Sequence, residues 1–232
     1  MPDRIVILTG AGLSAESGLG TFRDKGGIWT RHRIEDVATP DAFARDPDRV
    51  HAFYNERRAQ AAAARPNAAH VALARLQAQH PGSVTIVTQN VDALHERAGA
   101  TAIHMHGELG RAKCHACDHR WPAPPAMRHD DSCPACDARA TRPDVVWFGE
   151  MPYHMDEIAR HLLSCDLFAA IGTSGNVYPA AGFVQEAARA GARKVELNLE
   201  LTELSDLFDD RLTGPASKIV PDWVEAVLAP MR

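Results

Sequence analysis

The chain has 232 residues, of which 45% are hydrophobic and 24% charged, and its formal net charge is −5. This composition is typical of one or two globular domains and excludes disordered, collagen-like and coiled-coil proteins. No apolar run approaches the roughly 18 residues of a membrane-spanning helix, and the first residues lack a signal-peptide pattern. A cytoplasmic protein without a membrane is therefore expected, and the acidic balance argues against a stable nucleic acid partner.

Strand-like and helical segments alternate along the chain. The strand-like segments are 4–10, 84–90, 101–107, 166–174 and 194–200, with Ala-rich helical stretches between most of them. Asp46 before Pro47 and Asn67 after Pro66 mark two helix starts. The alternation predicts the α/β class, with a Rossmann-like parallel sheet covered by helices on both faces.

The block 111–142 interrupts this alternation and contains four of the five cysteines. It predicts an inserted small module, with 1–110 and 143–232 forming the main domain and the helical segment 30–80 contributing to the small lobe. Six Lys and Arg residues against four acids, with one aromatic residue, make the module a weak platform for nucleic acid.

Two cysteine pairs in this module have the spacing of a metal site. Cys114 and Cys117 are followed, after fifteen intervening residues, by Cys133 and Cys136. The spacing predicts one zinc ion bound by four thiolates, which leaves no open coordination position and makes the metal structural. The alternative is two unrelated reduced pairs or a redox pair. Cys165 is expected to be buried without a function.

Glycines follow the first strand-like segment directly. Gly10, Gly12 and Ala15 match the dinucleotide fingerprint, in which glycine lets the backbone approach a pyrophosphate. A Gly-rich turn without a ligand is the alternative. A polar loop follows in place of a second strand, and Glu200 is the acid expected to meet a ribose hydroxyl. Residues 172–174 end another strand, so three segments converge on one crevice.

Together these motifs resemble one family, the sirtuins, which are NAD-dependent protein-lysine deacylases. The matching segments are 10–23, 88–99, 104–109, the four cysteines, 142–152, 172–181, 198–200 and 214–217, in the order that the family has them. The resemblance covers essentially the whole chain. It implies NAD as cosubstrate, one zinc ion, and acylated-lysine proteins or peptides as partners, with a monomer expected.

The resemblance also implies the site residues. His106 would be the general base, assisted by Asn90 and Asp92, although strand alternation alone leaves His104 equally eligible. His51, His70 and His80 are expected on the surface or in packing. The NAD-binding residues would be Gly10, Ala11, Gly12, Ser14, Ala15, Phe22, Arg23, Gln89, Asn90, Asp92, Gly172, Thr173, Ser174, Asn198, Leu199, Glu200 and Ala216.

Tyr54 and Arg57, at positions i and i+3, would project from one helix face, with Arg58 on the surface. Solvated helix residues are the alternative, but the resemblance implies a subclass in which such a pair binds the carboxylate of succinyl and malonyl groups. Removal of acetyl, succinyl and malonyl groups is therefore expected. ADP-ribosyl transfer and a non-catalytic ADP-ribose-binding scaffold are the alternatives. An edge strand over 145–150 would pair with the peptide through Val146, Trp147, Phe148, Gly149 and Glu150.

Overall fold

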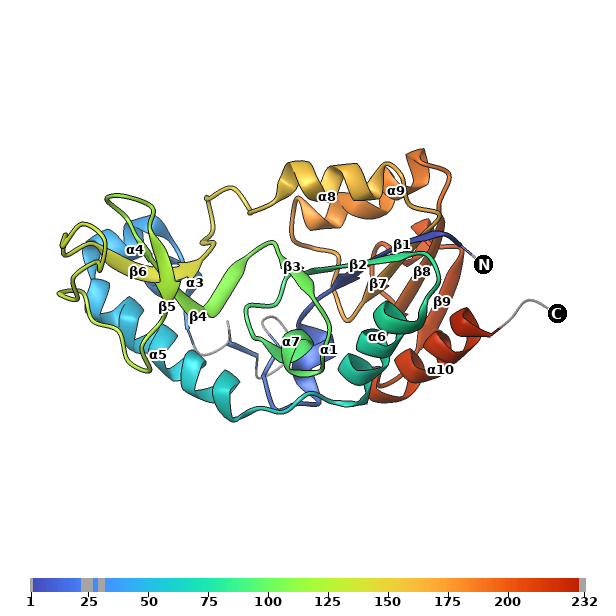
Figure 1. Ribbon diagram of the computed structural model, residues 1–232, viewed down its shortest axis with the longest axis horizontal. Coiled ribbons are helices and arrows are strands. Elements are labelled where there is room, and N and C mark those ends of the chain that lie inside the picture. The colour runs from blue at the N-terminus through green and yellow to red at the C-terminus, as the bar shows by residue number, and fades with distance from the viewer. Residues whose placement is uncertain (1, 22–26, 29–31, 230–232) are drawn as a thin grey trace.

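The computed structural model describes residues 2–21, 27–28 and 32–229, and they form two lobes (Figure 1). In the larger lobe, six strands pair in the order β3-β2-β1-β7-β8-β9, and every pair is parallel. The expected parallel sheet is therefore confirmed. The strands are β1 (Arg4–Thr9), β2 (Ser83–Thr88), β3 (Ala102–His104), β7 (Leu167–Ile171), β8 (Arg193–Asn198) and β9 (Asp210–Thr213).

Helices cover both faces of this sheet. The helices α8 (Met155–Leu162) and α9 (Phe183–Arg189) lie on one face, and α6 (Ala68–Gln79) and α10 (Ala216–Leu228) lie on the other (Figure 1). Both strand faces are consequently buried, which explains why the central strands are continuous apolar runs.

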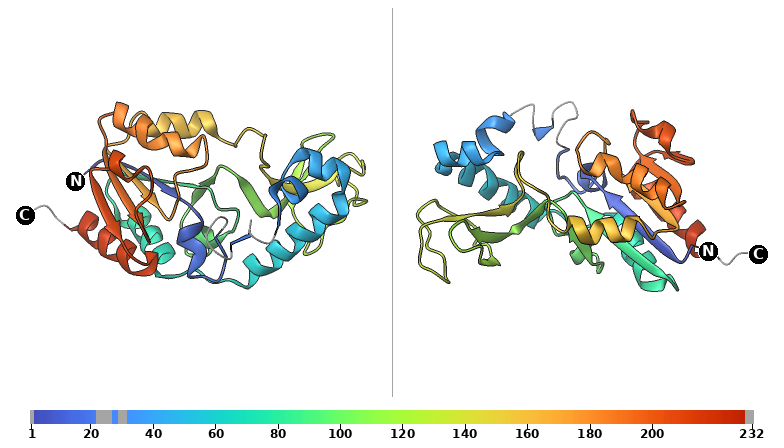
Figure 2. Two further views of the ribbon diagram at one scale, coloured as in Figure 1. Left: turned by 180° about the vertical axis from the view of Figure 1, so that it is seen from behind. Right: turned by 90° about the horizontal axis from the view of Figure 1, so that it is seen from above.

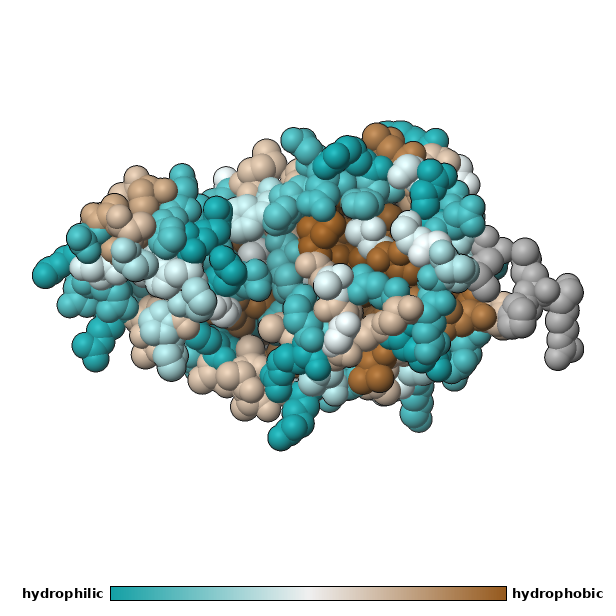
Figure 3. Space-filling model, in the orientation of Figure 1, coloured by the Kyte–Doolittle hydropathy of each residue, from teal (hydrophilic) through white to brown (hydrophobic). Residues whose placement is uncertain are grey.

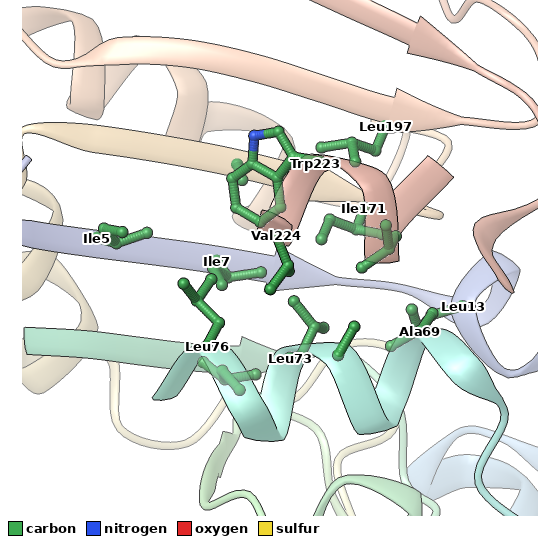
Figure 4. Close-up of a cluster of buried hydrophobic side chains, with 14 of the residues drawn as sticks. Ile5, Ile7, Leu13, Ala69, Leu73, Leu76, Ile171, Leu197, Trp223 and Val224 are labelled. Carbon is green, nitrogen blue, oxygen red and sulfur yellow. The ribbon is translucent and has the colours of Figure 1, made fainter. Parts of the chain in front are cut away.

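An apolar core between the sheet, α6 and α10 stabilises the larger lobe. Figure 4 shows Ile7 of β1 and Ile171 of β7 facing Leu73 of α6 and Val224 of α10. Burying one such aliphatic side chain stabilises a fold by about 1.5–3 kcal/mol. The start of α6 is fixed as predicted, because the Asn67 side chain accepts a hydrogen bond from the Ala69 N–H.

The smaller lobe combines a second sheet with helices from an earlier part of the chain (Figure 2). Its sheet is antiparallel, in the order β5-β4-β6, with β4 at Gly107–Cys114, β5 at Arg120–Pro122 and β6 at Thr141–Val145. This sheet extends beyond the expected limits 111–142 on both sides. The helices α3 (Ile34–Val37), α4 (Pro40–Arg45) and α5 (Pro47–Ala63) join it in one core.

The expected helical contribution of 30–80 to the small lobe is only partly right. Helix α6 packs on the large sheet because Leu73 and Leu76 belong to its core. Short elements complete the fold: α1 (Ala11–Ala15), α7 (Leu94–Arg97), and the single turns η1 (Ala180–Gly182) and η2 (Ser205–Leu207).

The molecular surface has few large apolar areas on the face shown in Figure 3, where hydrophobic residues are exposed mainly on the large lobe, between α8 and α6. Across the described residues, every helix is too short or too polar to span a membrane.

Candidate active site

A cavity of about 870 Å³ is lined by residues of both lobes. It lies where β1, β2, β7 and β8 end, the edge at which parallel sheets bind ligands. The segments 10–15, 172–174 and 198–200, which the sequence predicted to converge, all contribute to its wall, as do Gln89 and Asn90, which the resemblance implied. The predicted residues that line it are Gly10, Ala11, Gly12, Ala15, Tyr54, Arg57, Gln89, Asn90, His106, Val146, Trp147, Phe148, Gly149, Glu150, Gly172, Thr173, Ser174, Asn198, Leu199, Glu200 and Ala216.

The glycines of the fingerprint are required by a contact between two strand ends. A Cβ atom on Gly10 would lie 2.7 Å from the Gly172 backbone oxygen, and one on Gly12 would lie 2.8 Å from the Gly172 Cα. The Gly12 N–H donates to the Gly172 oxygen at 2.8 Å. Any side chain here would push the two walls of the cavity apart, so the glycines fix the spacing of the site.

Ser14 and Asp92 lie behind the main cavity and hold the side chain of Asn90 through a chain of hydrogen bonds. The Asn90 amide donates to the Ser14 hydroxyl at 3.1 Å, and that hydroxyl donates to the Asp92 carboxylate at 3.0 Å. Both residues line a small void of about 20 Å³ beside the main cavity, together with Asn90. Burial raises the pKa of Asp92, although hydrogen bonds from Leu94 and Ser14 partly oppose that change. This chain of bonds fixes Asn90 in one orientation.

His106 lies in the turn between β3 and β4, with its ring at the cavity wall. Its Nδ1 atom lies 3.0 Å from the Gln89 backbone oxygen, which can only accept, so Nδ1 carries the proton. The Nε2 lone pair is therefore left to act as a base. Burial lowers the pKa of His106, and the bond to Gln89 opposes this only partly. The ring is thus neutral at physiological pH, as a base must be.

His104 has the opposite character. Its two ring nitrogens face the Asn90 backbone oxygen at 3.2 Å and the Glu96 carboxylate at 3.0 Å. Both partners accept, so both nitrogens carry protons and the ring is a cation. Burial by itself lowers the pKa of His104, but the hydrogen bond and charge of Glu96 raise it overall. His104 has no lone pair to offer, so the geometry favours His106 over His104 as a candidate base.

Helix α5 places Tyr54 and Arg57 on the cavity wall. The helix begins as predicted at Asp46, whose side chain accepts from the Arg49 N–H. Burial lowers the pKa of Arg57, while Tyr54, Asp92 and Glu56 oppose that change. Burial also raises the pKa of Tyr54, so its hydroxyl keeps its proton. A cation and a hydroxyl donor consequently face one partly apolar space.

The prediction that Arg58 lies on the surface is wrong. Its side chain is buried and donates to the Leu109 backbone oxygen at 2.8 Å and to Asn55 at 2.7 Å. Arg58 fixes α5 to β4 because an unpaired carbonyl at this interface would be costly. His51, His70 and His80 are all buried, so they are packing residues.

The segment 145–150 is not the strand that was predicted. Strand β6 ends at Val145, and a turn follows in which Gly149 has φ +91°. The Val146 N–H donates to the His106 oxygen at 2.9 Å, and the Phe148 N–H donates to Ala38 at 3.0 Å. The Glu150 carboxylate binds Arg142, so it is engaged inside the lobe.

The four cysteines of the small lobe converge. Their sulfur atoms all lie within 4.8 Å of one another, with Cys114 and Cys136 at 3.7 Å and Cys117 and Cys133 at 3.8 Å. A tetrahedral site with Zn–S bonds of about 2.3 Å has sulfur atoms about 3.8 Å apart. The cysteines are therefore positioned to bind one zinc ion as a closed structural site. Cys165 is buried elsewhere, against α8 and α9.

Some functional residues escaped the sequence reasoning. Glu96, which makes His104 a cation, is identifiable only from the fold, because it lies in α7 and His104 lies in β3, eight positions later. Tyr178 and Thr202 also line the cavity, and Tyr178 lies in one of the segments that resemble sirtuins. Phe22 and Arg23, predicted to bind NAD, lie outside the described residues.

Comparisons with known proteins agree with this site. The model of the Sir2 family matches residues 10–179. An NAD-dependent protein deacylase of Caulobacter vibrioides is 54% identical over 232 residues, covering 97% of each chain. A mutant Sir2 homologue in complex with ADP-ribose has a TM-score of 0.92 and 37% identity, covering 100% of this chain and 96% of the other.

A Sir2 homologue in complex with NAD is similar over 98% of this chain and 91% of its own, with a TM-score of 0.89 and 38% identity. The family model and these relatives thus indicate the same family as the glycine segments, the turn that contains His106 and the four cysteines. The chain belongs to the Sir2 family, the sirtuins.

Proposed function

We propose that this protein is an NAD-dependent protein-lysine deacylase that removes acetyl, succinyl and malonyl groups. The observation that carries the proposal is the neutral His106, whose Nε2 lone pair lies on a cavity walled by the predicted dinucleotide segments. The names of the similar proteins support the same activity. NAD would supply the ribose that receives the acyl group: the nicotinamide–ribose bond and the acyl–lysine amide bond would break, one water would be consumed, and the products would be free lysine, nicotinamide and O-acyl-ADP-ribose.

The chain's own residues would prepare this transfer. His106 would accept a proton from a ribose hydroxyl, a role typically worth about 10²–10⁴ in rate. Asn90 is held by Gly10 and Ser14, so its remaining groups can orient the ribose without moving. Such fixed groups lower the barrier because little reorganisation is needed during the reaction.

The acyl end of the cavity has the chemistry to accept a carboxylate. Arg57 supplies a positive charge and Tyr54 a hydroxyl, next to the apolar walls of Phe53 and Val91. A carboxylate entering such a space needs a charged partner, whereas a neutral acetyl group does not. Arg57 and Tyr54 would therefore select succinyl and malonyl groups.

The substrate peptide would lie beside the turn at 146–150. Phe148 and Met151 are exposed here by 39% and 77%, and Phe148 also lines the cavity. An acylated-lysine protein would cover these apolar side chains while its lysine enters the cavity. We infer a monomer in the cytoplasm, with zinc holding the small lobe in shape.

The experiment is a side-by-side assay on one peptide carrying acetyl- or succinyl-lysine. With NAD present, both should release nicotinamide in step with free lysine and O-acyl-ADP-ribose, detected by mass spectrometry. Transfer of ADP-ribose to protein without lysine deacylation would instead make the chain an ADP-ribosyltransferase. Binding of ADP-ribose without nicotinamide release would make it a scaffold.

A further inference from the structure

Tyr54 receives a hydrogen bond from a second buried side chain of the cavity wall. The indole Nε1–H of Trp147 donates to the Tyr54 hydroxyl oxygen at 3.1 Å, although 93 residues separate the two in sequence. Tyr54 is 6% exposed and Trp147 3% exposed, and both line the cavity. An indole N–H can only donate, so the phenol must act as the acceptor in this bond. Its own O–H then points away from the Trp147 N–H.

Trp147 is itself held in one orientation by an ion pair between the buried Arg142 and the partly exposed Glu150. The Arg142 guanidinium carbon lies 3.4 Å from the centroid of the Trp147 ring, and Arg142 is 2% exposed. Arg142 donates two hydrogen bonds to Glu150, at 2.6 and 2.8 Å. The same Glu150 carboxylate accepts the Trp147 backbone N–H at 2.8 Å. The ring and the backbone of Trp147 are thus fixed by one pair of charges.

We propose that Trp147 is a positioning residue for acyl selectivity, which sets the Tyr54 hydroxyl to donate into the acyl cavity. This inference rests on the proposed function and deepens it. With the Tyr54 oxygen occupied by Trp147, Tyr54 presents a donor to the cavity, as the Arg57 guanidinium does. A carboxylate offers acceptors only and matches them. A terminal primary amide of the same size would place its N–H donors against the donors of Tyr54 and Arg57, so the cavity should bind it less well.

The substitution Trp147→Phe isolates this bond. Phenylalanine keeps an aromatic face for the Arg142 guanidinium and for Phe43, whose ring centroid lies 5.1 Å from that of Trp147. The substitution removes the N–H group that donates to Tyr54. The Tyr54 hydroxyl proton is then no longer held towards the acyl cavity and can turn to another direction. Phe43→Leu is the matched control, because it loosens the packing on Trp147 but leaves its N–H in place.

The experiment measures kcat and KM for acetyl-, succinyl- and succinamide-lysine forms of one peptide. Trp147→Phe should lower kcat/KM for the succinyl peptide by about two- to tenfold, the value of one neutral hydrogen bond. The acetyl value should fall by a smaller factor than the succinyl value, and an unchanged thermal midpoint would show that the variant folds correctly. Discrimination between succinyl and succinamide should narrow, and Phe43→Leu should leave the succinyl-to-acetyl ratio unchanged.

The decisive comparison measures the effect of Trp147→Phe in a protein that also carries Tyr54→Phe. If Trp147 acts through the Tyr54 hydroxyl, Trp147→Phe should have no further effect on the succinyl peptide once that hydroxyl is absent. An equal loss in both backgrounds, or an equal loss on acetyl and succinyl peptides, would overturn the inference and make Trp147 structural. If Tyr54→Phe matters and Trp147→Phe does not, only this inference fails. If Tyr54→Phe itself leaves desuccinylation unchanged, the proposed acyl site fails with it.

Discussion

The Nδ1 atom of His106 lies 3.0 Å from the backbone oxygen of Gln89, and the same atom of His104 lies 3.2 Å from the backbone oxygen of the next residue, Asn90. Two neighbouring carbonyl groups thus bind two neighbouring histidines in the same way. The difference is Glu96, which binds only His104 and makes it a cation. The His106 ring is thus neutral with a lone pair on Nε2, whereas the His104 ring is a cation.

Replacing His106 by Ala should reduce deacylation by at least about 100-fold, because a general base acts in the transition state. NAD affinity and the thermal midpoint should change little. His104→Gln is the comparison, since a glutamine amide can still donate to Asn90 and Glu96. It should retain most of kcat while lowering the thermal midpoint. An equal loss of kcat in both variants, with both folded, would mean that the base is assigned wrongly.

The pH profile should reflect the lowered pKa of His106. The base is active when neutral, so activity is lost as the pH falls through its pKa. Because burial brings that pKa below its ordinary value of 6.5, the acid limb of kcat/KM should lie below pH 6.5. Rates measured from pH 5 to 8 would show this limb. A midpoint above pH 7 would contradict the environment described for His106.

Metal analysis should find one zinc ion per chain. Cys136→Ser should lose the metal and lower the thermal midpoint and activity together, because zinc binding contributes to folding free energy. Cys165→Ser is the control, since a serine hydroxyl can replace the thiol that donates to the Leu162 oxygen. It should retain both zinc and activity. Full zinc content in the Cys136 variant would contradict the four-cysteine site.

Stability should fall in mild acid because of two buried histidines beneath the active site. Burial lowers the pKa of His95 to about 4 and that of His70 to about 3. Below pH 6.5 these two histidines become protonated in the unfolded chain, whereas they stay neutral in the folded protein. The free energy of unfolding then drops by up to about 1.4 kcal/mol per pH unit and histidine. This stability is complete above pH 6.5 and is lost as the pH falls towards 4.

Urea denaturation at pH 7 and pH 5 would measure this loss. His95→Gln removes one titrating group but can still bond to Thr9, the partner of the His95 ring. The variant should be less sensitive to the change of pH than the unsubstituted protein. The same difference between the two pH values in both proteins would show that His95 does not contribute.

Much of this molecule was predictable from local patterns. The caps at Asp46 and Asn67, the parallel strands and the cysteine pairs are signalled by neighbouring residues. The contact that requires glycine at Gly10 depends on Gly172, far along the chain, and no local pattern contains it.

The burial of long polar side chains was also not predictable from the sequence. Arg58 follows Arg57 directly, yet it bonds to Leu109 of another element. The bond from Trp147 to Tyr54 joins two segments that come together only when the small lobe folds. Such hydrogen bonds depend on how distant segments pack, so residue spacing and composition could not predict them.

We propose that Arg57 recognises an acyl carboxylate. The most direct test of this proposal is kcat/KM on succinyl- and acetyl-lysine forms of one peptide, for the unsubstituted protein and for Arg57→Met. Losing a charged partner in a pocket commonly costs about 2–5 kcal/mol, so the succinyl value should fall by roughly 30-fold to several-thousand-fold. The acetyl value should change little or rise. A proportionate fall in both values would make Arg57 structural and contradict the account of acyl selectivity.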